Sequence, residues 1–306
     1  MPRQEGWFVV VNPASGGGRA GRRWPALARA LADAGLRFEH VITGHPGHAT
    51  SLVHDAIQAG WRQVLAVGGD GVLHEALHGL MAQQSVPPLE VCLGAAPLGS
   101  GNDWARSRRI PADPDGTARC LVDARMTLQD VGRLHFPDAA PPRADCYFIN
   151  VAGAGIDADI LARLPSGVPR RLAYLIGLFR SLASFSPARF DLLADGRDER
   201  ARLLVALLAM GPYCGGGMRL APQADPGDGW LDLVKVEPLR LPRELPSLRR
   251  LFDGRLPEER FVHLDRVRQV RIAASPPVVV QADGQLVGHT PVTASLLPAA
   301  IRVLCN

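Results

Sequence analysis

A glycine-rich loop with one acidic side chain offers the clearest chemistry in this sequence. The loop is Gly68-Gly69-Asp70-Gly71, between a run of apolar residues and a segment with helical spacing. Glycines let the main chain approach a ligand closely, and main-chain amides at a helix start bind anions such as phosphate. Asp70 would repel a phosphate, so we expect Mg²⁺ to bridge this carboxylate and a bound nucleotide. The alternative interpretation is a tight turn in which Asp70 caps the helix.

Two further glycine-rich loops follow apolar runs. Residues 12–18 read Asn-Pro-Ala-Ser-Gly-Gly-Gly, and residues 96–106 contain Gly-Ser-Gly-Asn-Asp, whose last two residues could instead cap a helix. Residues 16–21 fit the G-x-G-x-x-G pattern, but they do not follow the strand directly, and the next strand ends at Thr43 without an acid for a ribose. A dehydrogenase is therefore disfavoured. A P-loop NTPase is excluded because the lysine of its motif is missing.

Two acidic turns occur later in the chain. Residues 282–285 read Ala-Asp-Gly-Gln, which alone indicates a hairpin turn of the Asp-Gly type. Residues 225–232 contain Asp225, Asp228 and Asp232 around two glycines, and they fit either a solvated acidic turn or a cation-binding loop.

Composition bounds the class of protein. The 306 residues carry a net charge of +4 with a pI of about 9.0, which is too mildly basic for a dedicated nucleic-acid binder. Almost all of the positive charge is arginine, and Lys235 is the one lysine. The cysteines show no CxxC pair and mostly have apolar neighbours, so we expect buried thiols in a reducing compartment; they are Cys92, Cys120, Cys146, Cys214 and Cys305.

The apolar runs predict where the protein lies in the cell. The N-terminus does not read as a signal peptide, and no run reaches the ~20 apolar residues that span a bilayer. We therefore expect a cytoplasmic protein whose membrane contact, if any, is peripheral. Its oligomeric state, monomer or homodimer, stays open.

The elements that must position the first three loops alternate between strand and helix. Strands are expected at residues 7–11, 36–43, 64–67 and 91–95, and helices at 19–34, 47–59 and 72–82. This order predicts an α/β domain over residues 1–125 with a parallel, Rossmann-like sheet. In such a sheet, ligands bind beyond the carboxyl ends of the strands, where all three loops would lie.

The second half of the chain has a different pattern. Strands follow one another, with two helices expected at residues 170–185 and 242–252 and a proline-rich loop at 136–143. The expected strands are residues 127–134, 146–152, 190–194, 203–210, 230–236, 267–272, 278–282 and 290–296. We predict a mainly antiparallel β-sandwich over residues 126–296, while residues 297–306 could return to the first domain.

Six motifs in this order resemble the diacylglycerol kinase catalytic-domain family, in particular the soluble bacterial lipid kinases. The matching segments are residues 12–16, 68–75, 97–106, 150–158, 225–232 and 283–284. The resemblance covers nearly the whole chain. It implies a fold like those of NAD kinase and diacylglycerol kinase, and a kinase that transfers the terminal phosphate of ATP to a hydroxyl group of diacylglycerol or a related lipid at a membrane surface.

The resemblance also implies roles for individual residues. Asp70 would anchor the catalytic Mg²⁺, Asp283 would align the lipid hydroxyl, and Gln285 would stand beside it. A second Mg²⁺ would be held by Asp225, Asp228 and the carbonyl of Trp230. The residues implied to bind ATP are Asn12, Pro13, Ala14, Ser15, Gly16, Thr43, Gly68, Gly69, Asp70, Gly71, Val72, Leu73, His74, Gly99, Ser100, Asn102 and Asp103.

Three positions depart from the family pattern. Val72 and Ser100 stand where the family has threonine, and Gln285 stands where it has glutamate. Glutamine cannot accept a proton, so the loss of a base makes a non-catalytic nucleotide-binding protein one alternative. An NAD kinase or sugar kinase is another, since a Gly-Gly-Asp-Gly loop occurs there too.

Two segments could meet the lipid. Residues 170–180 are apolar with basic ends, as in a helix that touches a membrane, although an ordinary core helix would look the same. A basic stretch could meet anionic headgroups or be a solvated face; it comprises Arg240, Arg243, Arg249, Arg250 and Arg255.

Overall fold

The structure, a computed structural model, divides into two units. It describes residues 4–123, 125–138, 145–165, 168, 170–240 and 243–305. Unit 1 comprises residues 1–129 and 299–306, and unit 2 comprises residues 130–298.

Unit 1 is built on a parallel sheet. Its strands are β1 (Trp7–Val11), β2 (Phe38–Ile42), β3 (Gln63–Gly68) and β4 (Cys92–Pro97), in the order β2-β1-β3-β4, and the end of β16 (Val292–Cys305) pairs parallel to β4. β1 and most of β3 and β4 are buried, as apolar runs in a covered parallel sheet should be.

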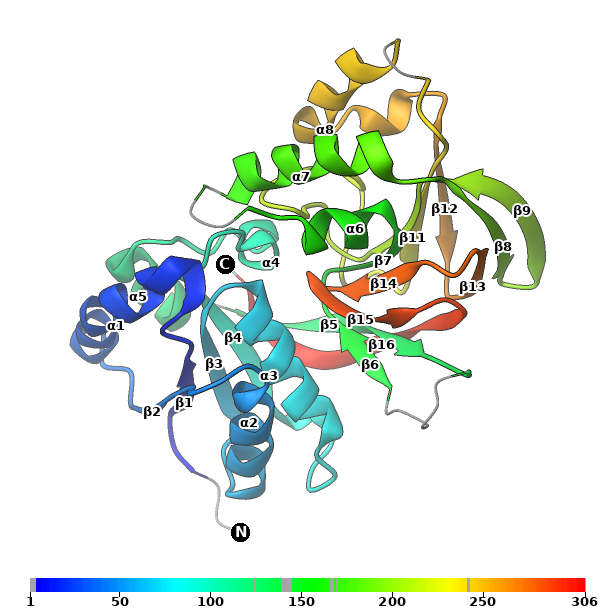
Figure 1. The fold of residues 1–306 in the computed structure, drawn as a ribbon. Coiled ribbons are helices and arrows are strands. Elements are labelled where there is room, and N and C mark those ends of the chain that lie inside the picture. The colour runs from blue at the N-terminus through cyan, green and yellow to red at the C-terminus, as the bar shows by residue number, and fades with distance from the viewer. Residues whose placement is uncertain are drawn as a thin grey trace. The chain divides into compact units, whose positions relative to one another are not determined.

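Helices connect the parallel strands of unit 1, as crossovers require (Figure 1). They are α1 (Ser15–Asp33), α2 (His48–Gln58) and α3 (Asp70–Ala82), followed by α4 (Asp103–Ser107) and α5 (Pro114–Asp123). Trp24, Leu27 and Leu31 of α1 pack with α5 on one core beside the sheet, because they recur at intervals of three and four. α2 packs against α3. A 3₁₀ turn at Pro88–Glu90 precedes β4.

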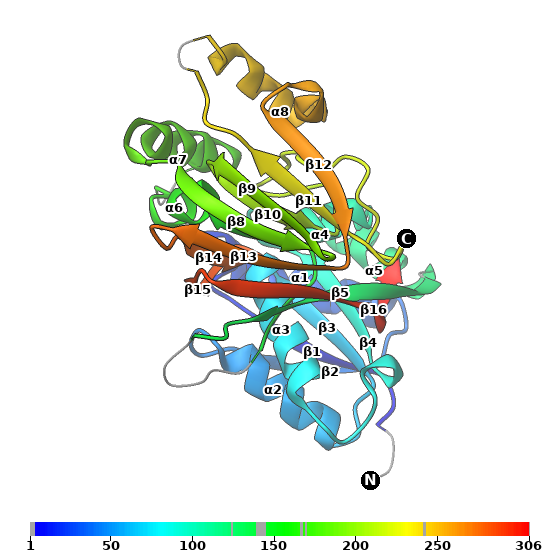
Figure 2. The ribbon, with the colours of Figure 1, turned by 90° about the vertical axis from the view of Figure 1, so that its right-hand side faces the viewer.

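Unit 2 is a sandwich of two antiparallel sheets (Figure 2). One has the order β12-β11-β10-β7-β14-β15, and the other contains the start of β16, β13, β8 and β9, with β5 and β6 beside them. The strands of the first are β7 (Val151–Gly155), β10 (Val205–Ala209), β11 (Leu231–Val236), β12 (Val262–Val267), β14 (Val279–Ala282) and β15 (Gln285–His289). Those of the second are β5 (Arg125–His135), of which residues 130–135 belong to unit 2, β6 (Cys146–Phe148), β8 (Ala188–Ala194), β9 (Arg197–Leu203) and β13 (Gln269–Ser275).

The central strand β10 of the first sheet of unit 2 is buried on both faces. Ala206 and Leu208 of β10 point into the core of the sandwich, whereas Val205, Leu207 and Ala209 pack with the helices. The helices are α6 (Ile156–Ala162), α7 (Arg170–Ser184) and α8 (Arg250–Asp253), with 3₁₀ turns at Leu245–Arg249 and Leu256–Glu258. This arrangement explains why β10 is a continuous apolar run and does not alternate.

The predicted fold class is confirmed: an α/β unit with a parallel sheet precedes an antiparallel β-sandwich. Some elements differ from the sequence prediction. Residues 146–152 were expected to form one strand but form two, because strand pairing is interrupted between Phe148 and Val151. Residues 243–252, where a single helix was expected, form a 3₁₀ turn and one short helix. Most of the proline-rich loop at 136–143 lies outside the described residues.

Candidate functional site

The glycine-rich loops of unit 1 follow the carboxyl ends of parallel strands. β1, β3 and β4 end at Val11, Gly68 and Pro97, where the three loops begin or have just begun. The chain runs from β1 outward to β2 and then returns to β3 on the other side of β1. A reversal of this kind creates the crevice in which α/β sheets bind ligands, here between β1 and β3.

The loop after β1 turns sharply before its helix. Gly16, Gly17 and Gly18 have φ angles of 65°, 66° and 81°, so three consecutive residues adopt the left-handed conformation before the regular part of α1. Side chains with a Cβ are strained there, which explains the run of three glycines. Asn12 holds the start of the loop, since its side-chain oxygen accepts a hydrogen bond from the Ala14 amide at 3.1 Å.

The loops after β1, β3 and β4 are in contact with one another. A Cβ on Gly68 would lie 2.7 Å from Ser15 Oγ, and a Cβ on Gly16 would lie 3.1 Å from the Leu98 carbonyl oxygen. The Gly99 amide donates to the Gly68 carbonyl at 2.6 Å. The structure therefore brings the three loops together at the carboxyl end of the sheet, as the sequence predicted for a parallel sheet.

Asp70 connects the loop after β3 with the helix after β4. It occupies the first position of α3, and its Oδ1 accepts a hydrogen bond from the main-chain amide of Trp104 at 3.3 Å. The N-terminal end of a helix favours a carboxylate because the helix dipole is positive there. Its oxygens are hard ligands of the type that Mg²⁺ prefers, so this residue fits the predicted metal.

Asn102 shapes the loop after β4. It has a φ of 56°, and its Nδ2 donates to the carbonyls of Pro97 at 3.1 Å and Gly99 at 3.0 Å. Its Oδ1 is buried without a hydrogen-bond partner among the described residues. A buried acceptor without a donor is costly, and a ligand or water that donates to Oδ1 would remove that cost.

The predicted ATP-binding residues differ in what they can offer a nucleotide. Val72, Leu73 and His74 are buried near the start of α3, and Asp103 is buried beside Arg106, so these four side chains offer a nucleotide little accessible surface. Ser100 is exposed, and Asn12, Pro13 and Ser15 are partly exposed on the loop. Thr43 extends β2, since its amide donates to the Val11 carbonyl at 2.9 Å.

Glu75 has a role that the sequence did not reveal. Its carboxylate accepts hydrogen bonds from the amides of Gly47 at 2.9 Å and Ala49 at 3.1 Å at the start of α2, while Thr50 Oγ1 donates to the Glu75 carbonyl. This one side chain therefore fixes the N-terminus of α2 against α3. Neither neighbouring sequence contains a signal for this contact, because the partners are about 26 positions away.

In unit 2, Asp283 is the most strongly held of the predicted catalytic residues. The hairpin between β14 and β15 has two residues, Asp283 and Gly284, with φ angles of 47° and 84°, as a type I′ turn requires. The Asp283 carboxylate accepts hydrogen bonds from three consecutive amides: Ile149 at 2.9 Å, Asn150 at 3.0 Å and Val151 at 3.1 Å. Asp283 therefore fixes the short connection between β6 and β7. The sequence analysis did not predict this structural role.

Gln285 begins β15 directly after this turn, and its side chain is exposed. The position lies two residues from Asp283, so the sequence difference from the family's glutamate falls at the hairpin itself. An exposed side chain here costs little to exchange, which makes the residue well suited to a test of its chemistry.

The Asp225–Trp230 loop is held by its own carboxylates. Asp225 Oδ1 accepts from the Gly227 amide at 3.0 Å, and Asp228 Oδ1 accepts from the Trp230 amide at 3.1 Å. Asp130, which is buried and was missed from the sequence, accepts from the Gly229 amide at 2.8 Å. The only hint in the sequence was an acid in the middle of a strand-like run.

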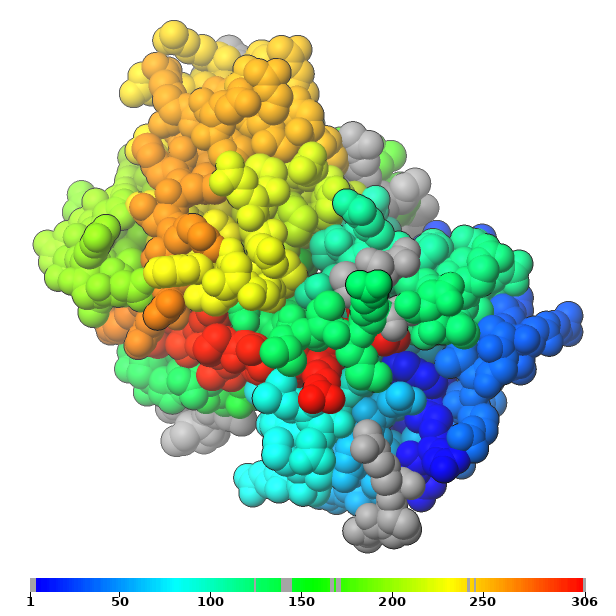
Figure 3. Space-filling view, turned by 180° about the vertical axis from the view of Figure 1, so that it is seen from behind, coloured from blue at the N-terminus to red at the C-terminus, as the bar shows by residue number. Residues whose placement is uncertain are grey.

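Arg266 of β12 competes with a cation for one of the carboxylates of this loop. Its guanidinium pairs with Asp228 Oδ2 and lies over the Trp230 ring. Burial raises the pKa of the neighbouring Asp232, an effect that Arg266 opposes and Asp228 reinforces. The carboxylates fit a hard cation, but it would have to share Asp228 with Arg266. In the space-filling view, the segment before β11 (yellow) is at the surface next to β12 (orange) (Figure 3).

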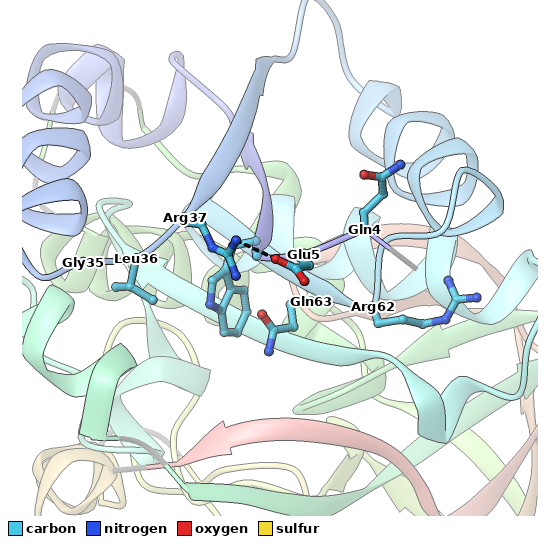
Figure 4. A pocket seen from close by; sticks show the side chains of 9 residues that line it. Gln4, Glu5, Gly35, Leu36, Arg37, Arg62 and Gln63 are labelled. Carbon is cyan, nitrogen blue, oxygen red and sulfur yellow. Dashed lines mark ion pairs between the residues drawn. The ribbon is translucent and has the colours of Figure 1, made fainter. Parts of the chain in front are cut away.

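A hollow of about 530 Å³ lies at the opposite end of the parallel sheet (Figure 4). It is lined by residues at the starts of β1 and β3, including Trp7 and Gln63, and an ion pair joins Glu5 to Arg37 across it. The carboxyl ends with the glycine-rich loops are the other ends of these strands, so this hollow is not part of the candidate site.

Comparison with known proteins identifies the family of this chain. A family model described as the YegS C-terminal NAD kinase beta sandwich-like domain matches residues 150–305, and one described as the diacylglycerol kinase catalytic domain matches residues 6–134. The chain belongs to the diacylglycerol kinase catalytic-domain family. Members of this family of lipid kinases use ATP, and the resemblance stated from the sequence is confirmed.

Individual relatives agree with this membership. The chain is 31% identical over 274 residues, 88% of its length and 84% of the relative's, to a protein of Chromohalobacter salexigens named "Probable lipid kinase YegS-like". It is 29% identical to a protein of Mycobacterium tuberculosis named diacylglycerol kinase, over 97% of this chain and 94% of that protein. The crystal structure of a diacylglycerol kinase from Bacillus anthracis shares the fold, with a TM-score of 0.73 and 19% identity over 100% of this chain and 98% of that one.

None of the four cysteines whose side chains the structure describes forms a disulfide bond, and three of them are buried. Burial raises the pKa of the Cys92 thiol to about 12, with a smaller opposing effect of Arg302. None of the helices within the described residues combines the length and the apolar character that crossing a bilayer requires.

Proposed function

We propose that this protein transfers the terminal phosphate of ATP, with Mg²⁺, to the hydroxyl group of diacylglycerol or a closely related lipid. The observation that supports it best is the contact of three glycine-rich loops at the sheet's switch point, with Asp70 among them. Membership of a lipid kinase family gives the class of reaction. The acceptor is taken from the resemblance to relatives named diacylglycerol kinase.

The residues of unit 1 would act on the nucleotide by position and charge. Main-chain amides of the loops after β1 and β3 would hold the phosphates. A magnesium ion bound at Asp70 would neutralise the charge that develops on the transferred phosphate. Phosphoryl transfer passes through a loose transition state, so positioning and electrostatics contribute more than a strong base.

In unit 2, Asp283 would orient the lipid hydroxyl. Three amide hydrogen bonds already engage its carboxylate, which fixes its position and leaves it suited to positioning more than to proton abstraction. The cation at Asp225 and Asp228, with the Trp230 carbonyl, would brace the loop that these residues already hold together.

The surface of α7 supports a lipid acceptor. Leu172 and Phe179 are 47% and 54% exposed, seven residues apart and so on one face of the helix, and the exposed Arg180 follows them. An apolar stripe with a basic end suits the interface of a membrane with anionic lipids. The basic stretch is weaker support, because Arg250 and Arg255 pair with glutamates, Glu258 and Glu259.

An assay with labelled ATP tests the proposal. The protein is supplied with diacylglycerol, phosphatidylglycerol or sphingosine in mixed micelles, or with NAD in solution, and the products are separated by thin-layer chromatography. Labelled phosphatidic acid is the expected product. Labelled NADP would instead identify an NAD kinase. Phosphorylation of another lipid would show that this lipid, and not diacylglycerol, is the acceptor.

A second candidate, a non-catalytic nucleotide-binding protein, is favoured by Gln285 alone. It predicts that ATP binds with measurable affinity in calorimetry, whereas a total lipid extract yields no labelled product. Detectable turnover on any component of the extract excludes it.

A further inference from the structure

A buried carboxyl group on α6 lies next to the strand that ends in the Asp283–Gly284 turn. α6 packs against β7, α7, β14 and β15, and Asp157 in its first turn is 8% exposed (Figure 1). This side chain belongs neither to the glycine-rich loops nor to the Asp225–Trp230 loop. Burying a carboxyl group without an ion-pair partner costs free energy, so its presence here needs an explanation.

The sheet provides a place for the Asp157 side chain. Gly153 of β7 lies directly opposite Gln281 of β14 in the register of the two strands. A Cβ on Gly153 would lie 2.1 Å from Asp157 Oδ2. The missing side chain at Gly153 therefore leaves the slot through which the carboxyl group reaches Gln281.

Two hydrogen bonds continue from Asp157 to the turn. Gln281 Nε2 donates to Asp157 Oδ2 at 3.0 Å, and Gln281 Oε1 accepts from the Gly284 amide at 2.9 Å. Gln281 is itself 5% exposed. Because Asp157 accepts a hydrogen bond, the amide of Gln281 must point its NH₂ group at Asp157 and its oxygen at Gly284.

From these contacts we infer that Asp157 is a positioning residue, which acts through Gln281 to hold the Asp283–Gly284 turn in its working geometry. The inference rests on the proposed function, since the turn carries the aspartate assigned to orient the lipid hydroxyl. A flipped Gln281 would direct its NH₂ group at the Gly284 N–H, two donors facing each other, and the turn would move.

The environment of Asp157 makes this relay sensitive to pH. Burial raises the pKa of Asp157 to about 7, and hydrogen bonds from Gln281 and from the amides of Ala158 and Asp157 itself lower it only in part. Its Oδ1 has no hydrogen-bond partner within the described part of the chain and is the oxygen that would carry a proton. Ionised, the carboxylate is the stronger acceptor for Gln281.

Other titratable groups stand on the elements packed around Asp157. β7 and β14 have none, Asp159 lies on α6 itself, α7 begins with Arg170 and Arg171 and also carries Tyr174 and Arg180, and β15 carries His289. Tyr174 is buried, whereas Arg180 and His289 are exposed, and Asp159 pairs with Arg163. Among the described residues, no neighbouring charge offsets the effect of burial on the pKa of Asp157, and hydrogen bonds alone oppose it.

Exchanging donor and acceptor within the pair is the decisive experiment. In the wild type, kcat should rise with pH near 7. Asp157→Asn should remove this rise and leave a low, pH-independent kcat, with KM for ATP unchanged.

Gln281→Glu should invert the pH profile of kcat, because two carboxyl groups must then share a proton, so that kcat falls as pH rises. In the double variant Asp157→Asn/Gln281→Glu, the new amide at position 157 can donate to the new carboxylate at position 281. That carboxylate still accepts from the Gly284 amide, and kcat should recover to at least half of the wild-type value.

Asp159→Asn is the matched control, since this acid lies on the same helix but pairs with Arg163 at 2.9 Å. It should keep the wild-type pH profile. The inference is overturned if Gln281→Glu keeps the wild-type profile, or if the double variant folds and is no more active than the single ones.

A measurement without turnover separates this inference from the proposed function. In protein labelled with ¹⁵N-glycine, the Gly284 amide, assigned by its loss in Gly284→Ala, should shift with pH around 7 in the wild type and not in Asp157→Asn. If the wild type phosphorylates none of the lipids while this amide titrates, the proposed function fails and the relay stands. If the amide does not titrate, the relay fails whatever the activity.

Discussion

Gly99 approaches Gly69 so closely that a Cβ on Gly99 would lie 2.3 Å from the Gly69 Cα atom. This contact joins the loop after β4 to the loop after β3, and the hydrogen bond between the Gly99 amide and the Gly68 carbonyl lies beside it. No side chain can enter without moving the main chain of one loop. The closeness of the two loops thus depends on glycine at these positions.

We expect Gly99→Ala to separate the two loops. The affinity for ATP should fall at least tenfold and the thermal midpoint by several degrees, because overpacking a rigid contact costs about 1–3 kcal/mol. Calorimetric titration with ATP and thermal unfolding would measure both. Gly44→Ala is the control, since its new Cβ would meet its nearest neighbour at an ordinary 3.7 Å; wild-type affinity in Gly99→Ala would contradict the assignment of this contact to the nucleotide site.

Asp70→Asn tests the carboxylate at the start of α3. Asparagine keeps an acceptor for the Trp104 amide, so the fold should stay, but the charge that would hold Mg²⁺ is gone. Turnover should fall at least a hundredfold, while ATP binding without Mg²⁺ stays the same or tightens, since a repulsive charge has been removed. The measurement is ATP affinity at several Mg²⁺ concentrations beside the lipid assay. Turnover near the wild-type rate would contradict the proposed role of Asp70 as a ligand of Mg²⁺.

The sequence predicted these loops well and the sandwich less well, for physical reasons. In unit 1, buried parallel strands are continuous apolar runs with glycine at their ends, so β1, β3 and β4 and their loops were located within a few residues. In unit 2, β9 reads Arg-Asp-Glu-Arg-Ala-Arg-Leu and was missed, because it is the exposed end strand of its sheet and contains little apolar signal.

The contacts that complete the site were beyond the sequence. Asp283 meets Ile149 across 134 positions, and Asp157 meets Gln281 across 124. Nothing near either residue in the chain indicates its partner, and a buried acid such as Asp157 resembles any helix-starting aspartate. Pairings of this kind follow from the register of β7 and β14, which is a property of the assembled sheet.

Asp283→Ala should cost stability as well as activity. Removing the carboxylate leaves three main-chain amides, those of Ile149, Asn150 and Val151, without their acceptor, at about 1–3 kcal/mol for each amide that water cannot reach. We expect the free energy of unfolding to fall by about 2–5 kcal/mol in urea denaturation. Asp195→Ala is a useful comparison, because it also removes a carboxylate that accepts main-chain amides, but at an exposed hairpin. Equal losses in the two variants would argue against a special role for the Asp283 contacts.

Gln285→Glu restores the residue type that the family carries at this position. The side chain is exposed at the start of β15, so the exchange should leave the thermal midpoint within about 2 °C. If a base at this position assists proton removal, turnover should rise severalfold, with a new dependence on pH near the ordinary pKa of glutamate. Gln285→Ala is the control for side-chain loss. Unchanged turnover in Gln285→Glu would indicate that positioning by Asp283 suffices.

The stability of Asp157→Asn should depend on pH less than that of the wild type. Burial raises the pKa of Asp157 to about 7, so between about pH 4 and pH 7 the folded state keeps a proton that the unfolded state has released. The free energy of unfolding of the wild type therefore falls across this range and stays low above it, by on the order of 4 kcal/mol from this group. The asparagine side chain of the variant is neutral at every pH, so the substitution removes this fall.

Urea denaturation of the two proteins at pH 5 and pH 8 measures this difference. Relative to the wild type, Asp157→Asn should gain stability at pH 8 compared with pH 5, and Asp159→Asn, whose carboxylate pairs with Arg163, should not. A difference between Asp157→Asn and the wild type that is the same at both pH values would show that Asp157 has an ordinary pKa, and hence that its carboxyl group is hydrated in solution.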